Sequence, residues 1–81
     1  MESIEFKAAG KRITLSKEQA VRKLRGTKPD VIQVHAVEIG GTMYPVKQAF
    51  AVLTDLDPLD FSPNQARGVF RRLGFKLSRK T

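Results

Sequence analysis

The stretch SPNQARGVFRRLG, residues 62–74, decides the fold class because it carries the complete set of signals for one short helix. Ser62 and Gln65 have the spacing of a capping box, and Pro63 stands at the first helical position. Gly74 is a typical helix end. Four apolar residues recur at the spacing of a single buried helix face: Ala66, Val69, Phe70 and Leu73. The sequence therefore predicts a helix over residues 63–73 that packs against a core.

Two more helices are predicted upstream of this one. Ser16 and Gln19 form another capping box, which places a helix at about residues 17–25. Pro45 opens a helix over residues 45–54, whose apolar residues again repeat at one-face spacing. A tight acidic loop then joins this helix to the one at 63–73. Two helices joined in this way suggest a helix-turn-helix-like pair.

The remaining segments predict strands. Residues 3–8 alternate between polar and apolar side chains, and residues 31–39 are rich in β-branched types. The Gly40-Gly41 pair permits a tight, hairpin-like reversal after the second of these strands. A last short strand is expected at 75–77, and residues 78–81 are expected to form a frayed basic tail.

These elements predict a small α+β fold with a short antiparallel sheet and three helices, in a single domain over residues 1–77. A chain of 81 residues is one small domain at most. It has no cysteine, which excludes disulfides and thiolate metal sites, and a single histidine, which excludes a histidine pair. No long apolar stretch and no secretion signal are visible, so we expect a cytoplasmic protein without a membrane partner.

Charge is distributed unevenly along the sequence. The formal net charge is +7. Residues 1–28 hold eight Lys/Arg against three acids, residues 29–63 hold one Lys against five acids, and residues 64–81 hold six Lys/Arg and no acid. Segregated charge of this kind points to a polyanionic partner, although a basic tail that only aids solubility is the alternative.

The outer face of the 63–73 helix is the strongest functional signal. It presents Asn64, Arg67, Gly68 and Arg71, with Arg72 beside them. A glycine in mid-helix costs about 1 kcal/mol relative to alanine. It is useful where a partner such as a DNA phosphate approaches the backbone, although close packing against another helix is the alternative. Arginine and asparagine are also the side chains that read guanine and adenine edges, while Lys76 and Lys80 suit phosphates.

Three short motifs resemble a known module: residues 38–47 (EIGGTMYPVK), 60–62 (DFS) and 72–77 (RLGFKL). Together they resemble a small accessory module found beside HNH nucleases and other modification-dependent restriction proteins. They are also similar to sulfur-binding domains that recognise phosphorothioate DNA. The resemblance covers about residues 31–77 and implies that Tyr44 and Pro45 face DNA, with Arg71 and Arg72 alongside. The sequence departs from the module at Val46 and at residues 63–64.

Several residues have a structural reading beside the functional one. Tyr44 can equally cover the core. Lys47 can contact phosphate or form an ion pair with Asp55 or Asp57. The three aspartates at positions 55, 57 and 60 fit a solvated turn between helices better than a cation-binding loop. His35 reads as a structural histidine. No nucleophile with catalytic partners in motif spacing, no metal-ligand set and no phosphate-binding glycine loop is visible, so the sequence predicts no enzyme and no cofactor.

The function predicted from these observations is non-enzymatic binding of duplex DNA, in the nucleoid, by the 63–73 helix and the basic N-terminal third. The expected contact residues are listed here: Tyr44, Pro45, Lys47, Asn64, Arg67, Gly68, Arg71, Arg72 and Lys76. Two alternatives stay open, an RNA or ribosome-associated protein and a module that binds an acidic protein. A homodimer is also compatible with so small a core.

Overall fold

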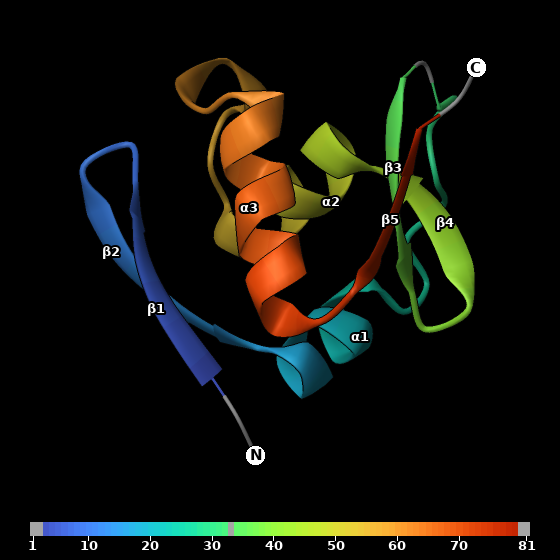
Figure 1. Ribbon diagram of the computed structural model, residues 1–81, viewed down its shortest axis with the longest axis horizontal. Helices are drawn as coiled ribbons and strands as arrows, with labels where there is room; N and C mark the ends of the chain where they lie inside the picture. The colour runs from blue at the N-terminus through green and yellow to red at the C-terminus, as the bar shows by residue number, and fades with distance from the viewer. Residues whose placement is uncertain (1–2, 33, 80–81) are drawn as a thin grey trace.

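The computed structural model describes residues 3–32 and 34–79 and has the predicted α+β class (Figure 1). Its elements in chain order are β1 (Ser3–Ala8), β2 (Lys11–Ser16), α1 (Lys17–Leu24), β3 (His35–Ile39), β4 (Thr42–Pro45), α2 (Val46–Thr54), the 3-10 turn η1 (Pro58–Asp60), α3 (Pro63–Leu73) and β5 (Lys76–Arg79). The strands form two separate antiparallel sheets, β1-β2 and β4-β3-β5, where the sequence analysis expected one.

The first sheet is a hairpin with a two-residue turn. Ala8 pairs with Lys11, and Ala9 and Gly10 between them have φ angles of 53° and 76°. Two consecutive residues with positive φ match the right-handed twist of the flanking strands, which is why such turns dominate short hairpins. The sequence analysis predicted β1 but missed β2, because it treated Gly10 only as a turn before α1.

The second sheet has β3 at its centre. The turn between β3 and β4 is Gly40-Gly41, with φ angles of 61° and 84°, so the predicted reversal is confirmed. β3 begins at His35 and not at residue 31, and β4 was not predicted at all. β5 extends to Arg79, so Ser78 and Arg79 belong to the sheet and not to a frayed tail. Residues 80–81 lie outside the described part of the chain.

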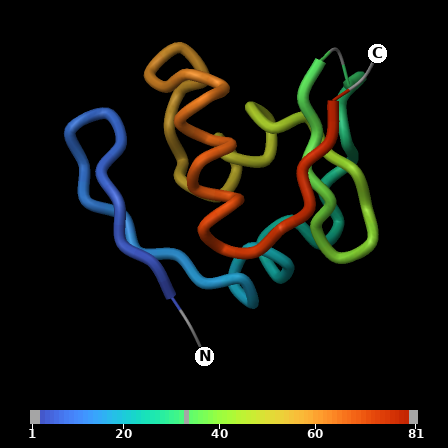
Figure 2. Tube along the Cα trace, in the orientation of Figure 1, coloured from blue at the N-terminus to red at the C-terminus, as the bar shows by residue number. Residues whose placement is uncertain are grey.

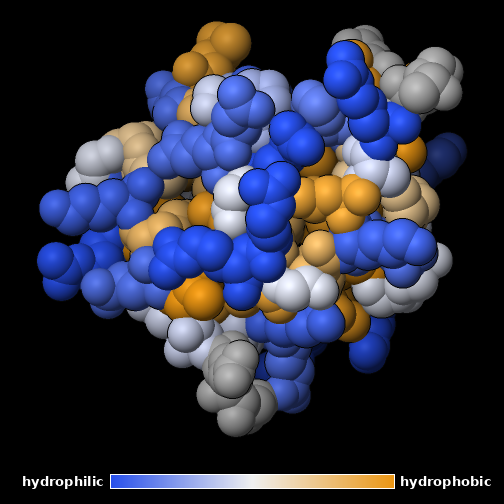
Figure 3. All heavy atoms as spheres, viewed as in Figure 1, coloured by the Kyte–Doolittle hydropathy of each residue, from blue (hydrophilic) through white to orange (hydrophobic). Residues whose placement is uncertain are grey.

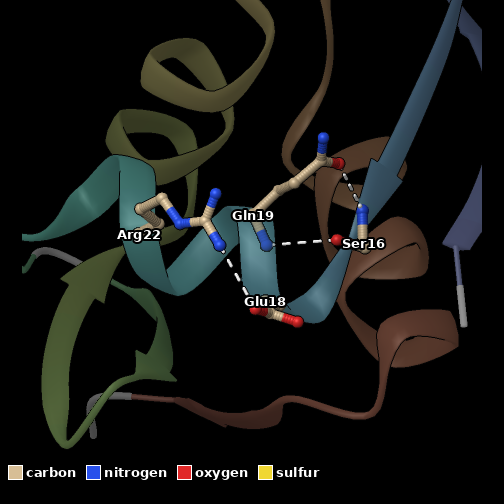
Figure 4. A network of polar contacts seen from close by, with 4 residues as sticks. All are labelled: Ser16, Glu18, Gln19 and Arg22. Carbon is tan, nitrogen blue, oxygen red and sulfur yellow. Dashed lines mark hydrogen bonds and ion pairs between the residues drawn. The ribbon is translucent and has the colours of Figure 1, made fainter. Parts of the chain in front are cut away.

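The helices start where their caps predict. Ser16 and Gln19 make both capping-box bonds at the start of α1, at 3.1 and 3.0 Å (Figure 4). Ser62 caps α3 by accepting a hydrogen bond from the Gln65 backbone at 3.1 Å. The Gln65 side chain does not return to complete a second capping box, because it bonds to β1 instead. At α2, Pro45 is the N-cap and the last residue of β4, so the helix begins at Val46, one position later than predicted.

Residues 55–62 connect α2 to α3 and include η1. Asp57 caps η1 by accepting a hydrogen bond from the Leu59 backbone at 2.9 Å, which gives this acid a structural role. The connection is longer than the three or four residues of a helix-turn-helix turn, so the helix-turn-helix-like arrangement stays a prediction.

Among residues 3–32 and 34–79, no group of three or more histidine, cysteine or acidic residues is placed to hold a metal ion.

The core is built around Phe50 of α2. Its ring contacts Phe6, Phe61 and Phe70 at centroid distances of 5.7, 4.6 and 6.0 Å. Phe75 in turn packs edge to face against Phe70, with the ring centroids 6.0 Å apart. α3 lies between the β1-β2 hairpin on one side and the β4-β3-β5 sheet on the other (Figures 1 and 2). One face of α3 is therefore buried, while the opposite face is exposed at Asn64, Arg71 and Arg72 and half-buried between them. None of the helices in the described ranges is long and apolar enough to cross a membrane.

Candidate nucleic-acid interface

The open side of α3 carries the polar residues that the helical period placed there. Asn64, Arg71 and Arg72 are exposed, whereas Arg67 and Gly68 are half-buried. We call these five residues the α3 outer face. Ala66, Val69, Phe70 and Leu73 are buried on the opposite side, as predicted. In the space-filling view, hydrophilic side chains gather over α3 (Figure 3).

Gly68 lies at the middle of the α3 outer face and has open space above it. A Cβ atom added at this position meets no heavy atom within 4 Å beyond the helix itself. Packing against another helix therefore does not explain the glycine. Because Gly68 has no side chain, the helix backbone is accessible at this position. The residues one turn away on either side are Asn64 and Arg72.

One flank of the α3 outer face is the β1-β2 hairpin. Gln65 donates a hydrogen bond from Nε2 to the backbone oxygen of Lys7 in β1, at 3.0 Å. Lys7 itself is exposed. The hairpin thus adds at least one lysine of the basic N-terminal third to the border of this surface.

The other flank is formed by β3 and β5. His35 and Arg79 are directly paired across these two strands, and Arg67 reaches toward His35 from α3. Burial of the imidazole and the positive charges of Arg67 and Arg79 hold the pKa of His35 below its ordinary value of 6.5. Nδ1 of His35 and Nε of Arg67 are covered from solvent, and neither atom has a hydrogen-bond partner among the described residues.

No acid neutralises the α3 outer face within the described ranges. The ion pairs in the described part of the chain lie elsewhere. Arg12 pairs with Glu5 in the hairpin, and Arg22 pairs with Glu18 on α1 (Figure 4). Arg67, Arg71 and Arg72 take part in neither. Lys76 is also exposed, but it lies directly across from Glu38 in the sheet, which lowers the local positive potential around it.

Tyr44 does not belong to this surface, which corrects the prediction that it faces DNA. Its side chain is only 4% exposed, and its hydroxyl donates a hydrogen bond to the backbone oxygen of Leu24 at 3.0 Å. A buried phenol needs such a partner, and this one ties β4 to the end of α1. Tyr44 is therefore a core residue.

Pro45 and Lys47 are not on α3; they lie at the start of α2. Both are half-buried. The Lys47 ammonium stands 5.1 Å above the centre of the Phe61 ring and forms no ion pair with Asp55 or Asp57. These two residues line a hollow that also includes His35. The sequence analysis missed His35 and Arg79 as functional candidates, because only the pairing of β3 with β5 brings them together.

The arrangement defines a small α+β domain with a basic, unneutralised helix face. The chain belongs to the SCO5918-like family, whose model matches residues 9–81. No curated protein and no solved structure matches the chain.

Proposed function

We propose that this protein is a non-enzymatic nucleic-acid-binding protein that holds duplex DNA on the α3 outer face. The observation that carries the proposal is the row of Arg67, Arg71 and Arg72 around the open backbone at Gly68, with no acid among them. Arginine forms strong, geometrically specific hydrogen bonds to phosphate oxygens, and unneutralised positive charge attracts the DNA backbone. The glycine allows that backbone to come close to the helix.

The flanks extend the surface without closing it. Lys7 borders it on the hairpin side and Arg79 on the β5 side, and both are exposed. Contacts from two flanks and a helix give a surface that can follow consecutive phosphates. The resemblance of three short motifs to accessory modules of restriction proteins also favours DNA as the ligand. We further propose that the protein is located at the nucleoid.

The test is fluorescence anisotropy of a labelled duplex of roughly 20 base pairs at two salt concentrations. If four phosphates are contacted, affinity should fall by about a hundredfold between about 50 and 200 mM salt. Arg71→Ala and Arg72→Ala should each weaken binding by about 1 kcal/mol and reduce the salt slope by about one. The matched control is Arg22→Ala, which removes the same charge from an ion pair on α1. Equal affinities for the control and the α3 variants would remove α3 from the mechanism.

Competition identifies the ligand class. An unlabelled RNA hairpin that displaces the duplex at lower concentration than DNA would favour the RNA-binding alternative. Absence of binding at low salt would favour an acidic protein as the partner of the same face. Sedimentation of the free protein would show in addition whether two copies present two such helices to one duplex.

A further inference from the structure

A hollow of about 640 Å³ lies beside the start of α3. Its volume is within the range of roughly 300–1,000 Å³ that is typical of small-molecule sites. Its walls come from the segment before β3, the first turn of α2 and the prolines that precede and begin α3. Val31 and Val34 line it and are 82% and 44% exposed, so two apolar side chains stand on the same hollow. The hollow thus has an apolar wall that no part of the described chain covers.

Another wall of the hollow, at the first turn of α2, carries positive charge. The first turn of α2 contains no acid, and no side chain caps it. The opening turn of a helix leaves backbone N–H groups without intrahelical acceptors and carries a partial positive charge. Lys47 lies in this turn and lines the same hollow. The Gln48 side chain bonds to the backbone of Lys28 and Asp30, which holds the segment before β3 against α2.

His35 stands at the edge of this positive wall. The residue lines the hollow, but its Nδ1 is covered from solvent and has no partner within the described ranges. The charged groups around it are Arg67 from α3, Arg79 from β5, Lys47 from α2 and Asp30 from the preceding segment. Three of these four charges are positive. An entering anion therefore meets a net positive environment, and it would also stabilise a protonated imidazole.

We propose that the hollow receives one nucleotide of the bound nucleic acid, with its phosphate at the first turn of α2 beside Lys47 and His35. This nucleotide is a terminal one or one flipped out of the stack, so that its sugar and base lie against Val31 and Val34. Phosphate fits because helix starts, ammonium groups and imidazolium donors all favour it. The apolar wall fits the rest of a nucleotide better than it fits a free anion. This inference rests on the proposed function and adds a second contact region at the end of the α3 outer face.

The single histidine of the chain gives a direct readout. Its ring signals in proton NMR report only on His35, and their titration gives its pKa. We expect a deoxynucleoside 5′-monophosphate to raise this pKa saturably above its value in sodium chloride of equal ionic strength. Once the titration of the nucleotide phosphate itself near about pH 6 is subtracted, linkage requires that affinity for the phosphate dianion increase as the pH falls from about 7.5 to about 5.5, because binding takes up a proton at His35.

Two variants separate the two halves of the ligand. Lys47→Gln should weaken nucleotide binding by about tenfold, whereas Lys11→Gln, which removes the same charge from the exposed start of β2, should not. Val31→Ser should weaken binding of the nucleotide but not of inorganic phosphate. Thermal melts check that each variant is folded. A response that is the same in Lys47→Gln as in the wild type would overturn the proposal.

The remaining arms identify the source of the phosphate. Inorganic phosphate that shifts the pKa at the same concentration as the nucleotide would mean a free-anion site and overturn the nucleotide assignment. Duplex binding by the wild type with no change in His35 titration would overturn the pocket and leave the proposed function intact. Nucleotide binding without duplex binding would support the pocket and overturn the proposed function.

Discussion

Gln65 of α3 and Lys7 of β1 are joined by a hydrogen bond of 3.0 Å between a side-chain amide and a backbone oxygen. The bond crosses from the last helix to the first strand and fixes the hairpin against α3. It also takes the Gln65 side chain away from the capping role that its position three residues after Ser62 predicts. The backbone of the hairpin at Lys7 therefore has a defined position relative to α3.

Gln65→Ala should loosen the hairpin more than the helix. The lost bond is exposed, so we expect a decrease in the free energy of unfolding of about 0.5–1 kcal/mol. Amide hydrogen exchange should accelerate in β1 and β2, while the α3 amides keep their protection because Ser62 still caps the helix. Uniform acceleration in both regions would contradict a local role for this bond.

Gly68→Ala should affect stability and binding in opposite directions. The added methyl group meets open space, so the helix should gain about 0.5–1 kcal/mol of stability from the higher propensity of alanine. If a phosphate approaches the backbone there, duplex affinity should fall by about fivefold or more. Chemical denaturation and anisotropy on the same variant measure both effects. A more stable protein with unchanged affinity would mean that the glycine does not serve binding.

Tyr44→Phe should reduce stability and leave DNA affinity unchanged. The variant keeps the buried ring and removes only the hydroxyl that bonds to Leu24, so a loss of about 1 kcal/mol is expected. Denaturant midpoints and the duplex titration together check this. A large loss of affinity in a variant that folds normally would return Tyr44 to the interface.

The pH dependence of stability should contain a contribution from His35. Burial, Arg67 and Arg79 lower its pKa in the folded protein, while the unfolded chain titrates near the ordinary value of 6.5. As the pH falls below 6.5, the unfolded state takes up the proton first, so the folded state loses stability until the pH passes the folded pKa. The difference in melting temperature between about pH 7.5 and pH 5 should therefore be smaller in His35→Gln than in the wild type.

The helices could be predicted because their signals are local in the sequence. The strands that the sequence analysis missed depend on pairing with other strands. The caps at Ser16 and Ser62 act within three residues, so they are readable in the sequence. β2 is defined by its pairing with β1 and β4 by its pairing with β3, and the limits of β3 and β5 depend on each other. Arg79 was assigned to a tail because nothing near it in the sequence shows that β3 begins opposite it.

The candidate surface divides in the same way. The helical period alone placed Arg71 and Arg72 outward and Phe70 inward, and the structure agrees. The burial of Tyr44 could not be read from its neighbours, because an amphipathic side chain suits a core and an interface equally. The meeting of His35 with Arg67 depends on how α3 lies against the sheet, which no local pattern encodes.

The position of Phe50 bears on how the molecule comes apart. Its ring joins one strand of the hairpin, the α2–α3 connection and α3, and Phe75 continues the cluster toward β5. Two sheets with no hydrogen bonds between them would otherwise be free to melt separately. Because each contributes to or adjoins this aromatic cluster, neither can detach without exposing it to water. The chain should consequently unfold in one cooperative transition, with the same midpoint by circular dichroism and by the ring resonances of its phenylalanines.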